Sequence, residues 1–245
     1  MKNTITLACV LCSLGSVTLE SRADFTPPGF LFRVFESGVA SGGEACDFGS
    51  VTQTSATEWF FQGNHSNTTG TSMSWSYLVD PDPFITGTFS LTNETLLAKA
   101  YVVDFSLPIS PAIAQSFVSG QMSGTLTDSN GSGSASMTST NGGAVYTALA
   151  DDVLVQSLMS NANQTVASAF GTTSFSGGSF GQGVPPLAGP AINSTIGIRF
   201  SFTLSAGDSV SFSSIFVANP VPTPGALAMG LMSGLVARRG RRRAE

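Results

Sequence analysis

Charged residues, histidine and cysteine are all scarce in this chain, and each shortage excludes a class of protein. Only 10% of the 245 residues are charged, and there are two lysines, one histidine and three cysteines. A single histidine excludes a metal site built from several histidines, and three cysteines exclude a disulfide framework. The net charge of −5 excludes a basic nucleic-acid-binding protein. Because 42% of the residues are hydrophobic, the chain is not a charge-rich disordered protein either.

Hydroxyl residues, glycine and phenylalanine make up much of the sequence instead. Serine and threonine, with 36 and 25 residues, form a quarter of the chain, and there are 27 glycines and 18 phenylalanines. Threonine favours strands because its branched Cβ suits the pleated surface of a sheet. The composition is typical of an exported β-protein.

Residues 1–23 have the pattern of a secretory signal peptide. The segment begins with a positive charge from lysine and continues with an uncharged, mostly apolar run. Ser21 and Ala23 then place small residues at −3 and −1 before Asp24, which is the arrangement that a signal peptidase accepts. A short buried N-terminal helix is the alternative interpretation.

The last 25 residues combine a proline-flanked motif at 221–224, an uncharged run at 225–237 and an arginine cluster at 238–243. At about 1.5 Å per residue, a helix over the uncharged run spans only about 20 Å of a membrane core that is about 30 Å thick. Arginines after an apolar run stop translocation and stay on the cytoplasmic side. We therefore expect a short helix that is inserted transiently and held for a processing enzyme. A lasting tail anchor is the alternative.

This three-part pattern resembles the PEP-CTERM sorting signal, in a variant with Pro-Thr-Pro-Gly-Ala-Leu wording like that of planctomycete-like bacteria. The usual motif is Val-Pro-Glu-Pro, and here threonine replaces the glutamate. Proteins of that family also carry an N-terminal signal peptide, and an exosortase, a membrane cysteine peptidase, recognises and processes the C-terminal signal. The resemblance implies an exported cell-surface or extracellular-matrix protein of a bacterium that makes exopolysaccharide, and it implies nothing about catalysis. The residues that carry it are Val221, Pro222, Thr223, Pro224, Arg238, Arg239, Arg241, Arg242 and Arg243.

The body between the two signals, residues 24–220, is strongly acidic. It contains three basic and 13 acidic residues, which gives a net charge of −10. Such a body repels polyanions, so we expect no binding to nucleic acid or to anionic lipid. Its length is sufficient for one well-buried domain, and no linker divides it.

Apolar and hydroxyl residues alternate through much of this body. In one example, Met73, Trp75, Tyr77 and Val79 are separated by Ser74, Ser76 and Leu78. Each such pattern predicts a strand with one apolar face and one serine- and threonine-rich face. Similar alternation recurs in residues 85–91, 101–107, 118–126, 200–204 and 210–217.

Turn-forming residues separate these runs at intervals of about 8–15 residues, with almost no helical periodicity. The spacing predicts an all-β fold, an antiparallel β-sandwich of jelly-roll type, flanked by the N-terminal signal helix and the short C-terminal membrane helix. We expect residues 206–208 to join the last two strands as a hairpin, and residues 171–190 to form a long loop. Residues 146–149 and 153–158 predict a further strand pair, with a short helix capped by Asp151 as the alternative.

Candidate catalytic residues are few. His65 is the single imidazole that a serine-protease-type triad could use, and it lies in a polar, turn-rich stretch where we expect an exposed loop histidine. Glycoside hydrolysis needs two paired carboxylates, but no motif selects a pair from the glutamates of the body. Those glutamates are Glu36, Glu44, Glu58 and Glu94.

Binding residues are equally sparse. The aspartates at 80–82 and 151–152 offer oxygen atoms, but they lack calcium-loop spacing and are typical of turns. Trp59, beside Glu58, is the better exposed candidate for stacking on a sugar ring, whereas Trp75 has the parity of a core residue. Cys46 is the one cysteine left after signal cleavage, and we expect it to be a buried, inert thiol.

These observations favour a noncatalytic exported protein with a structural or adhesive role at the cell surface or in the extracellular matrix. We expect no cofactor and no metal site; the processing partners are a signal peptidase and an exosortase-type peptidase. The first alternative is a carbohydrate-binding module for exopolysaccharide. The second alternative is a secreted polysaccharide-active enzyme.

The signal-peptide pattern predicts that the mature chain begins at Asp24. N-terminal sequencing of protein recovered from the cell envelope should give Asp24 as the first residue, because the small residues before it fit the peptidase pocket. A chain that still begins at Met1, or that begins elsewhere, would contradict the predicted cleavage.

Overall fold

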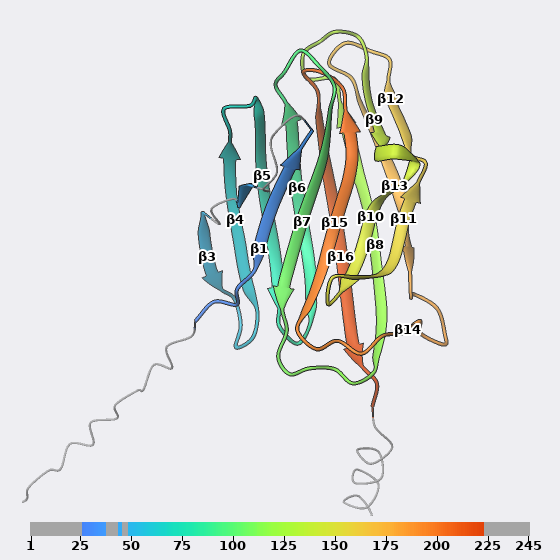
Figure 1. Cartoon of the computed structure of the whole chain (residues 1–245). Coiled ribbons are helices and arrows are strands. Elements are labelled where there is room, and N and C mark those ends of the chain that lie inside the picture. Colours follow the sequence, from blue (N-terminus) through green and yellow to red (C-terminus); the bar gives the residue numbers. More distant parts are fainter. Residues whose placement is uncertain (1–25, 38–43, 46–48, 223–245) are drawn as a thin grey trace, which may run out of the picture.

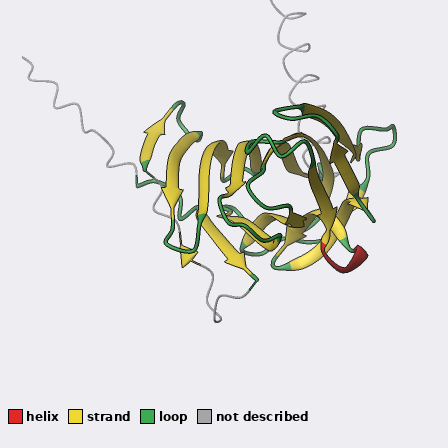
Figure 2. Cartoon of the chain, turned by 90° about the horizontal axis from the view of Figure 1, so that it is seen from above, coloured by secondary structure: helices red, strands yellow, loops and turns green. Residues whose placement is uncertain are grey.

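The computed structural model describes residues 26–37, 44–45 and 49–222, which form two antiparallel sheets packed face to face (Figure 1). Seen from above, the strands lie in two layers (Figure 2). The buried hydrophobic side chains form the core of the sandwich. The predicted antiparallel β-sandwich is therefore confirmed at the level of two packed sheets. The one helix in the described part of the chain is a 3₁₀ turn, η1, at Thr140–Gly142.

The first sheet, sheet A, contains eight strands. In spatial order its main path is β11 (Val153–Ser160), β10 (Ala144–Ala150), β15 (Thr195–Leu204), β7 (Lys99–Pro108), β1 (Leu31–Glu36) and β2 (Glu44–Ala45), with β9 (Ala135–Ser139) beside β15 and β12 (Asn163–Val166) beside β9.

The second sheet, sheet B, also contains eight strands. Its main path is β13 (Thr172–Phe180), β8 (Ser116–Thr127), β16 (Ser209–Pro220), β6 (Phe84–Asn93), β5 (Thr71–Asp80), β4 (Trp59–Ser66) and β3 (Ser50–Gln53), with β14 (Ala188–Gly189) beside β8.

The predicted alternation explains which side chains fill the space between the sheets. On β5, Met73, Trp75, Tyr77 and Val79 are each at most 5% exposed, whereas the serines between them lie on the outer face. The opposite strand leaves room for one of these rings: a Cβ on Gly87 would lie 2.6 Å from the Tyr77 ring, so only glycine fits opposite this tyrosine.

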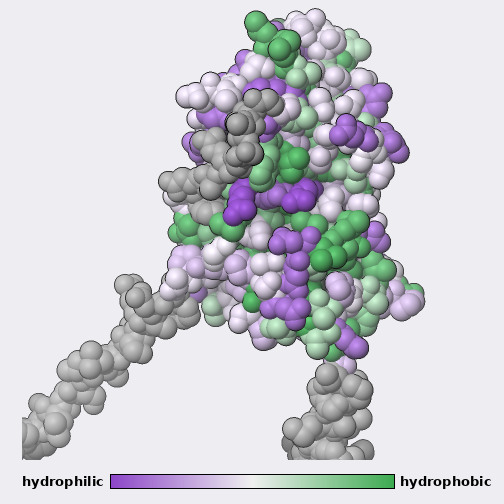
Figure 3. Space-filling model, viewed as in Figure 1, coloured by the Kyte–Doolittle hydropathy of each residue, from purple (hydrophilic) through white to green (hydrophobic). Residues whose placement is uncertain are grey.

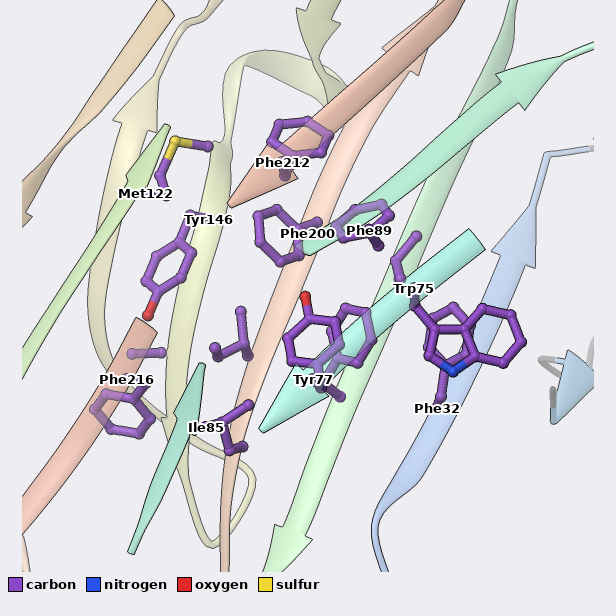
Figure 4. Close-up of a cluster of buried hydrophobic side chains, with 14 of the residues drawn as sticks. Phe32, Trp75, Tyr77, Ile85, Phe89, Met122, Tyr146, Phe200, Phe212 and Phe216 are labelled. Carbon is purple, nitrogen blue, oxygen red and sulfur yellow. The ribbon is translucent and has the colours of Figure 1, made fainter. Parts of the chain in front are cut away.

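Aromatic rings from both sheets meet at Phe105 on β7. The centroid of its ring lies 4.2 Å from that of Tyr77 and 5.5 Å from that of Phe89, both on sheet B. On its own side it stacks on Phe32 at 4.7 Å, and the ring of Phe200 lies edge-on at 6.3 Å. Figure 4 shows how Tyr77, Phe89 and Phe200 converge from different strands. This layer of rings joins the two sheets.

Both ends of the described domain leave the sandwich at the same end. Leu31, at the start of β1, pairs with Ser106, and Pro220, at the end of β16, pairs with Ser116. Ser106 and Ser116 flank the single connection from β7 to β8, so the two ends lie on either side of it (Figure 1).

The predicted hairpin at residues 206–208 is wrong. β15 belongs to sheet A and β16 to sheet B, so the short connection crosses from one sheet to the other. A tight turn that contains glycine can join two paired strands of one sheet or two strands of different sheets, and tertiary contacts decide between these outcomes. Here Asp208 turns inward, is fully buried and accepts a hydrogen bond from Ser205 Oγ.

The predicted long loop at 171–190 is also wrong over its first half, because Thr172–Phe180 forms β13 along β8. Its glycines and serines obscure the strand pattern, and the pairing register shifts between Ser176 and Gly178 as in a β-bulge. The predicted pair around Asp151 is confirmed as the β10–β11 hairpin. Asp151 and Asp152 have φ of 49° and 62°, as a two-residue hairpin turn requires.

Several predictions lie outside the described residues: the signal peptide, Cys46 and the C-terminal segment from Thr223 onward with its helix and arginines. Within the described part, no helix has the length and apolar character needed to cross a membrane.

Replacing Phe105 by alanine should lower the free energy of unfolding by about 3–5 kcal/mol, because it empties the space where rings from both sheets meet. Phe35→Ala is the matched control, since this phenylalanine on the neighbouring strand is 37% exposed, and we expect it to cost less than about 1 kcal/mol. Urea unfolding of both variants measures the difference. Equal losses would contradict the role given to Phe105.

Candidate functional site

The outer face of sheet A carries a row of charges across three strands. Arg33 on β1, Asp104 on β7 and Arg199 on β15 are register partners. Arg199 donates two hydrogen bonds to Asp104, from Nε to Oδ1 at 2.6 Å and from the terminal guanidinium nitrogen to Oδ2 at 2.8 Å. The hydrogen bond with Asp104 raises the pKa of Arg199 above its usual value.

A groove of about 480 Å³ follows this charged row. Besides the arginines it is lined by Leu31 and Phe35, which are 41% and 37% exposed, and by Asp152. Figure 3 shows hydrophilic surface at the middle of this face with hydrophobic surface beside it. Because Asp104 accepts both hydrogen bonds from the guanidinium group of Arg199, this pair is held in place on the sheet. The groove therefore has charged residues at its base and apolar side chains along its sides.

The outer face of sheet B has a different chemistry. Among its described strands the one acidic residue is Asp80, at the end of β5 and 8% exposed, and the strands contain no lysine or arginine. His65, on β4, is the one histidine and is half-buried. The charges of the described residues are therefore concentrated on sheet A and on the loops, and sheet B presents an almost uncharged surface.

Strand register aligns hydroxyl side chains into rows across this face. In three successive rows every outward position on β13, β8, β16, β6 and β5 is serine or threonine, and β4 completes each row with a polar residue. The rows are Thr172–Thr127–Ser209–Thr92–Ser72–Ser66, Ser174–Thr125–Ser211–Ser90–Ser74–Asn64 and Ser176–Ser123–Ser213–Thr88–Ser76–Gln62.

A second groove, of about 470 Å³, lies on this face where β13, β8, β16 and β6 run side by side. Its lining comes from two consecutive rows. One supplies Ser123, Ser213 and Thr88, and the next supplies Gln121 and Ile215. The groove therefore offers hydroxyls, one amide and an aliphatic wall.

Two carboxylates that the sequence did not single out meet at the end of the sandwich away from the described chain ends. Asp128 and Asp208 are both fully buried. Asp128 accepts hydrogen bonds from the backbone N–H groups of Gly131, Ser132 and Gly133. Burial raises the pKa of Asp208, and the nearby charge of Asp128 raises it further. The two carboxylates link the β8–β9 connection to the β15–β16 connection, and both are inaccessible to solvent.

The other predicted carboxylates are also engaged by the fold. Glu36 accepts hydrogen bonds from Asn67, Thr69 and Lys99, which link β1 to β7 and to the β4–β5 turn. Burial alone would raise the pKa of Glu36, but these donors outweigh it and the pKa lies below its ordinary value. Glu58 precedes β4 beside the Val79 end of β5, whereas Glu94 follows β6 beside the Thr71 end of β5, so the two glutamates lie at opposite ends of this strand.

The aspartates considered as calcium ligands face hydrogen-bond donors. The Asp80 carboxylate accepts from Thr57 Oγ1 at 2.7 Å and from the backbone N–H of Asp82 at 2.9 Å. Asp151 accepts from the backbone N–H groups of residues 193–195. Burial alone would raise the pKa of Asp151, but these donors together outweigh it and hold the pKa well below its usual range. Within the described residues, no group of three or more potential ligands lies together.

Trp59 does not lie where the sequence suggested. It is 8% exposed and belongs to the core, so the expectation of an exposed ring was wrong. Trp59 and Phe61 share one parity on β4, a signal that favoured burial, whereas Gln62 faces outward. His65 is on the same strand rather than in a loop. Of the sorting-signal residues, only Val221 and Pro222 are described; they follow β16 directly.

Comparison with protein-family models finds no match, and no curated protein matches the chain.

The buried carboxylate pair generates a prediction about pH. Asp208→Asn should leave stability unchanged or raise it by roughly 1 kcal/mol at pH 8, because the amide accepts from Ser205 without a buried charge. The raised pKa means that the wild-type carboxyl favours folding while protonated and loses this contribution as the pH rises through its folded value. The difference between variant and wild type should vanish at about pH 3.5, where this group is mostly protonated in both states. Urea unfolding across this pH range measures it.

Asp128→Asn is the control for that experiment. An amide there turns one NH₂ group toward backbone donors, so we expect a loss of about 1–3 kcal/mol. A larger loss for Asp208→Asn than for Asp128→Asn at pH 8 would contradict the assignment.

Proposed function

We propose that this protein is a noncatalytic exported protein of the cell surface or extracellular matrix, sorted through its C-terminal signal by an exosortase-type peptidase. The three-part pattern of residues 221–245 and the signal-peptide pattern of residues 1–23 support export and sorting. The observation that carries a display role is the position of the described ends. Both leave the sandwich at one end, beside the β7–β8 connection. A domain delivered through its C-terminal segment would then present both sheet faces and its far end outward.

The engagement of the acidic residues supports a structural or adhesive role. The two carboxylates that lie together, Asp128 and Asp208, are fully buried and join two connections. Glu36 and Asp104 hold neighbouring strands through Lys99 and Arg199. A glycosidase needs two accessible carboxylates on either side of a substrate bond. Glu36, Asp104, Asp128 and Asp208 instead connect elements of the fold.

The pattern of connections supports the finer fold assignment that we propose, a sandwich of jelly-roll type. From β6 to β9 the chain changes sheet at every step, and it does so again from β14 to β15 and to β16. Repeated crossing of the chain between two sheets is typical of jelly rolls.

Carbohydrate binding is a second candidate function, and one observation favours it. The outer face of sheet B is almost uncharged and lined with hydroxyl rows, although the body as a whole is strongly acidic. A matrix protein whose organism makes exopolysaccharide would meet polymers with this chemistry.

Sorting is tested by the mass of the protein at the cell surface. Intact-mass spectrometry should show that surface protein lacks the Arg238–Arg243 peptide, because a helix of about 20 Å is too short for lasting retention. Replacing the five arginines by serine should leave unprocessed or misdirected protein, since moving one arginine into the bilayer costs about 2.5–3.5 kcal/mol on insertion scales.

Arg33→Ser is the matched control, because it removes an arginine from the exposed face of the body and should leave sorting unchanged. A surface mass that includes everything through Glu245 would restore the tail-anchor interpretation.

A further inference from the structure

The groove on sheet B is a built feature of the sheet. It crosses β13, β8, β16 and β6, a distance of about 14 Å from first to last at about 4.8 Å per strand. Its two rows of lining residues are about 7 Å apart along the strands. Gly178 lies at its β13 end, with φ of 91°, and a Cβ there would meet nothing within 4 Å. The groove therefore remains open at this end.

Most hydroxyls of the groove have no internal partner among the described residues. Hydrogen bonds within the described chain engage Thr86 Oγ1, which donates to the Ser214 carbonyl, and Ser176 Oγ, which accepts from Gly178 N–H. Ser123, Ser213 and Thr88 have no such side-chain hydrogen bond in the described part of the chain. Each hydroxyl is both donor and acceptor, so the rows suit a ligand that is itself rich in hydroxyls.

Charge selects among such ligands. The body carries a net charge of −10, which opposes the approach of an anionic polymer. The groove contributes no charge of either sign, because its lining contains no acidic or basic residue. When an uncharged polymer binds there, no ion loses its hydration and no charge repels the polymer.

The shape of the groove favours a chain over a crystalline surface such as ice. The groove is hollow, and the amide of Gln121 and the aliphatic side chain of Ile215 line it together with the hydroxyls. It does not present one repeated side chain on a flat plane. The register shift between Ser176 and Gly178 further breaks the regular spacing on β13. Sugar rings present both hydroxyl edges and apolar C–H faces, and the lining offers partners for both.

We propose that the outer face of sheet B binds an uncharged polysaccharide, which lies across β13, β8, β16 and β6 in this groove. The inference deepens the carbohydrate-binding candidate above, and it rests on that part of the proposed function and not on the sorting signal. It replaces the aromatic platform that Trp59 was expected to supply with a hydroxyl-lined groove on the opposite side of the same sheet.

The test is affinity electrophoresis and titration calorimetry of the full chain against two neutral polymers, dextran and hydroxyethyl cellulose, and one anionic polymer, alginate. The wild-type protein should bind at least one neutral polymer and should bind it equally at 50 and 500 mM NaCl, because screening does not affect an uncharged interaction. Ser213→Asp should weaken binding at least about tenfold, because it places an unpaired charge at the centre of the groove.

Ser157→Asp is the matched control, since Ser157 is an exposed serine on β11 of sheet A. It should bind as the wild type does, and both variants should keep the wild-type melting temperature within a few degrees, as exposed substitutions do.

Four results would overturn the proposal: no binding to either neutral polymer, preference for alginate, equal loss in the two variants, or thermal hysteresis in ice without polysaccharide binding. None of these touches the sorting proposal, which the mass of the surface protein decides separately.

Discussion

The contact of aromatic rings across the two sheets is the interaction on which the rest of the structure depends. Phe105 from sheet A reaches Tyr77 and Phe89 from sheet B, and Phe89 continues the layer to Phe212 at 5.1 Å. These rings fill the interior because successive side chains of a strand point to opposite faces, so the serines and threonines that alternate with them on sheet B must face the other side. The apolar interior and the hydroxyl exterior of sheet B thus follow from a single period of two. The glycine at position 87 follows from the same packing, because the Tyr77 ring occupies the space that a Cβ at this position would need.

The outer faces of the two sheets differ in their charged residues. On the outer face of sheet A, Arg199 is held against Asp104 in an ion pair that joins neighbouring strands. The described strands of sheet B contain no lysine or arginine, and their outward serines and threonines face the solvent. A body with a net charge of −10 therefore retains one broad surface that an uncharged partner can approach without repulsion.

Much of the fold could be predicted from the sequence, because alternation and turn residues are local signals. The strand containing Trp75 and the hairpin around Asp151 followed from them. Partner choice is not local: the turn before Asp208 connects two sheets rather than two paired strands, and nothing in three residues distinguishes the two outcomes. The same holds for the site. The hydroxyl rows exist only once register places Ser213 beside Ser123, and the expectation of an exposed Trp59 failed because the parity it shares with Phe61 outweighs its polar neighbours.

A polymer that lies in the proposed groove contacts sheet B and leaves sheet A free. Hydroxyl-radical footprinting of the full chain, with and without a neutral polysaccharide, tests it directly because both outer faces carry reactive side chains. Polymer should protect Ile215, which lines the groove on sheet B, and should leave the labelling of Leu31 and Phe35 on sheet A unchanged. Protection of Leu31 and Phe35 with Ile215 still labelled would contradict the account.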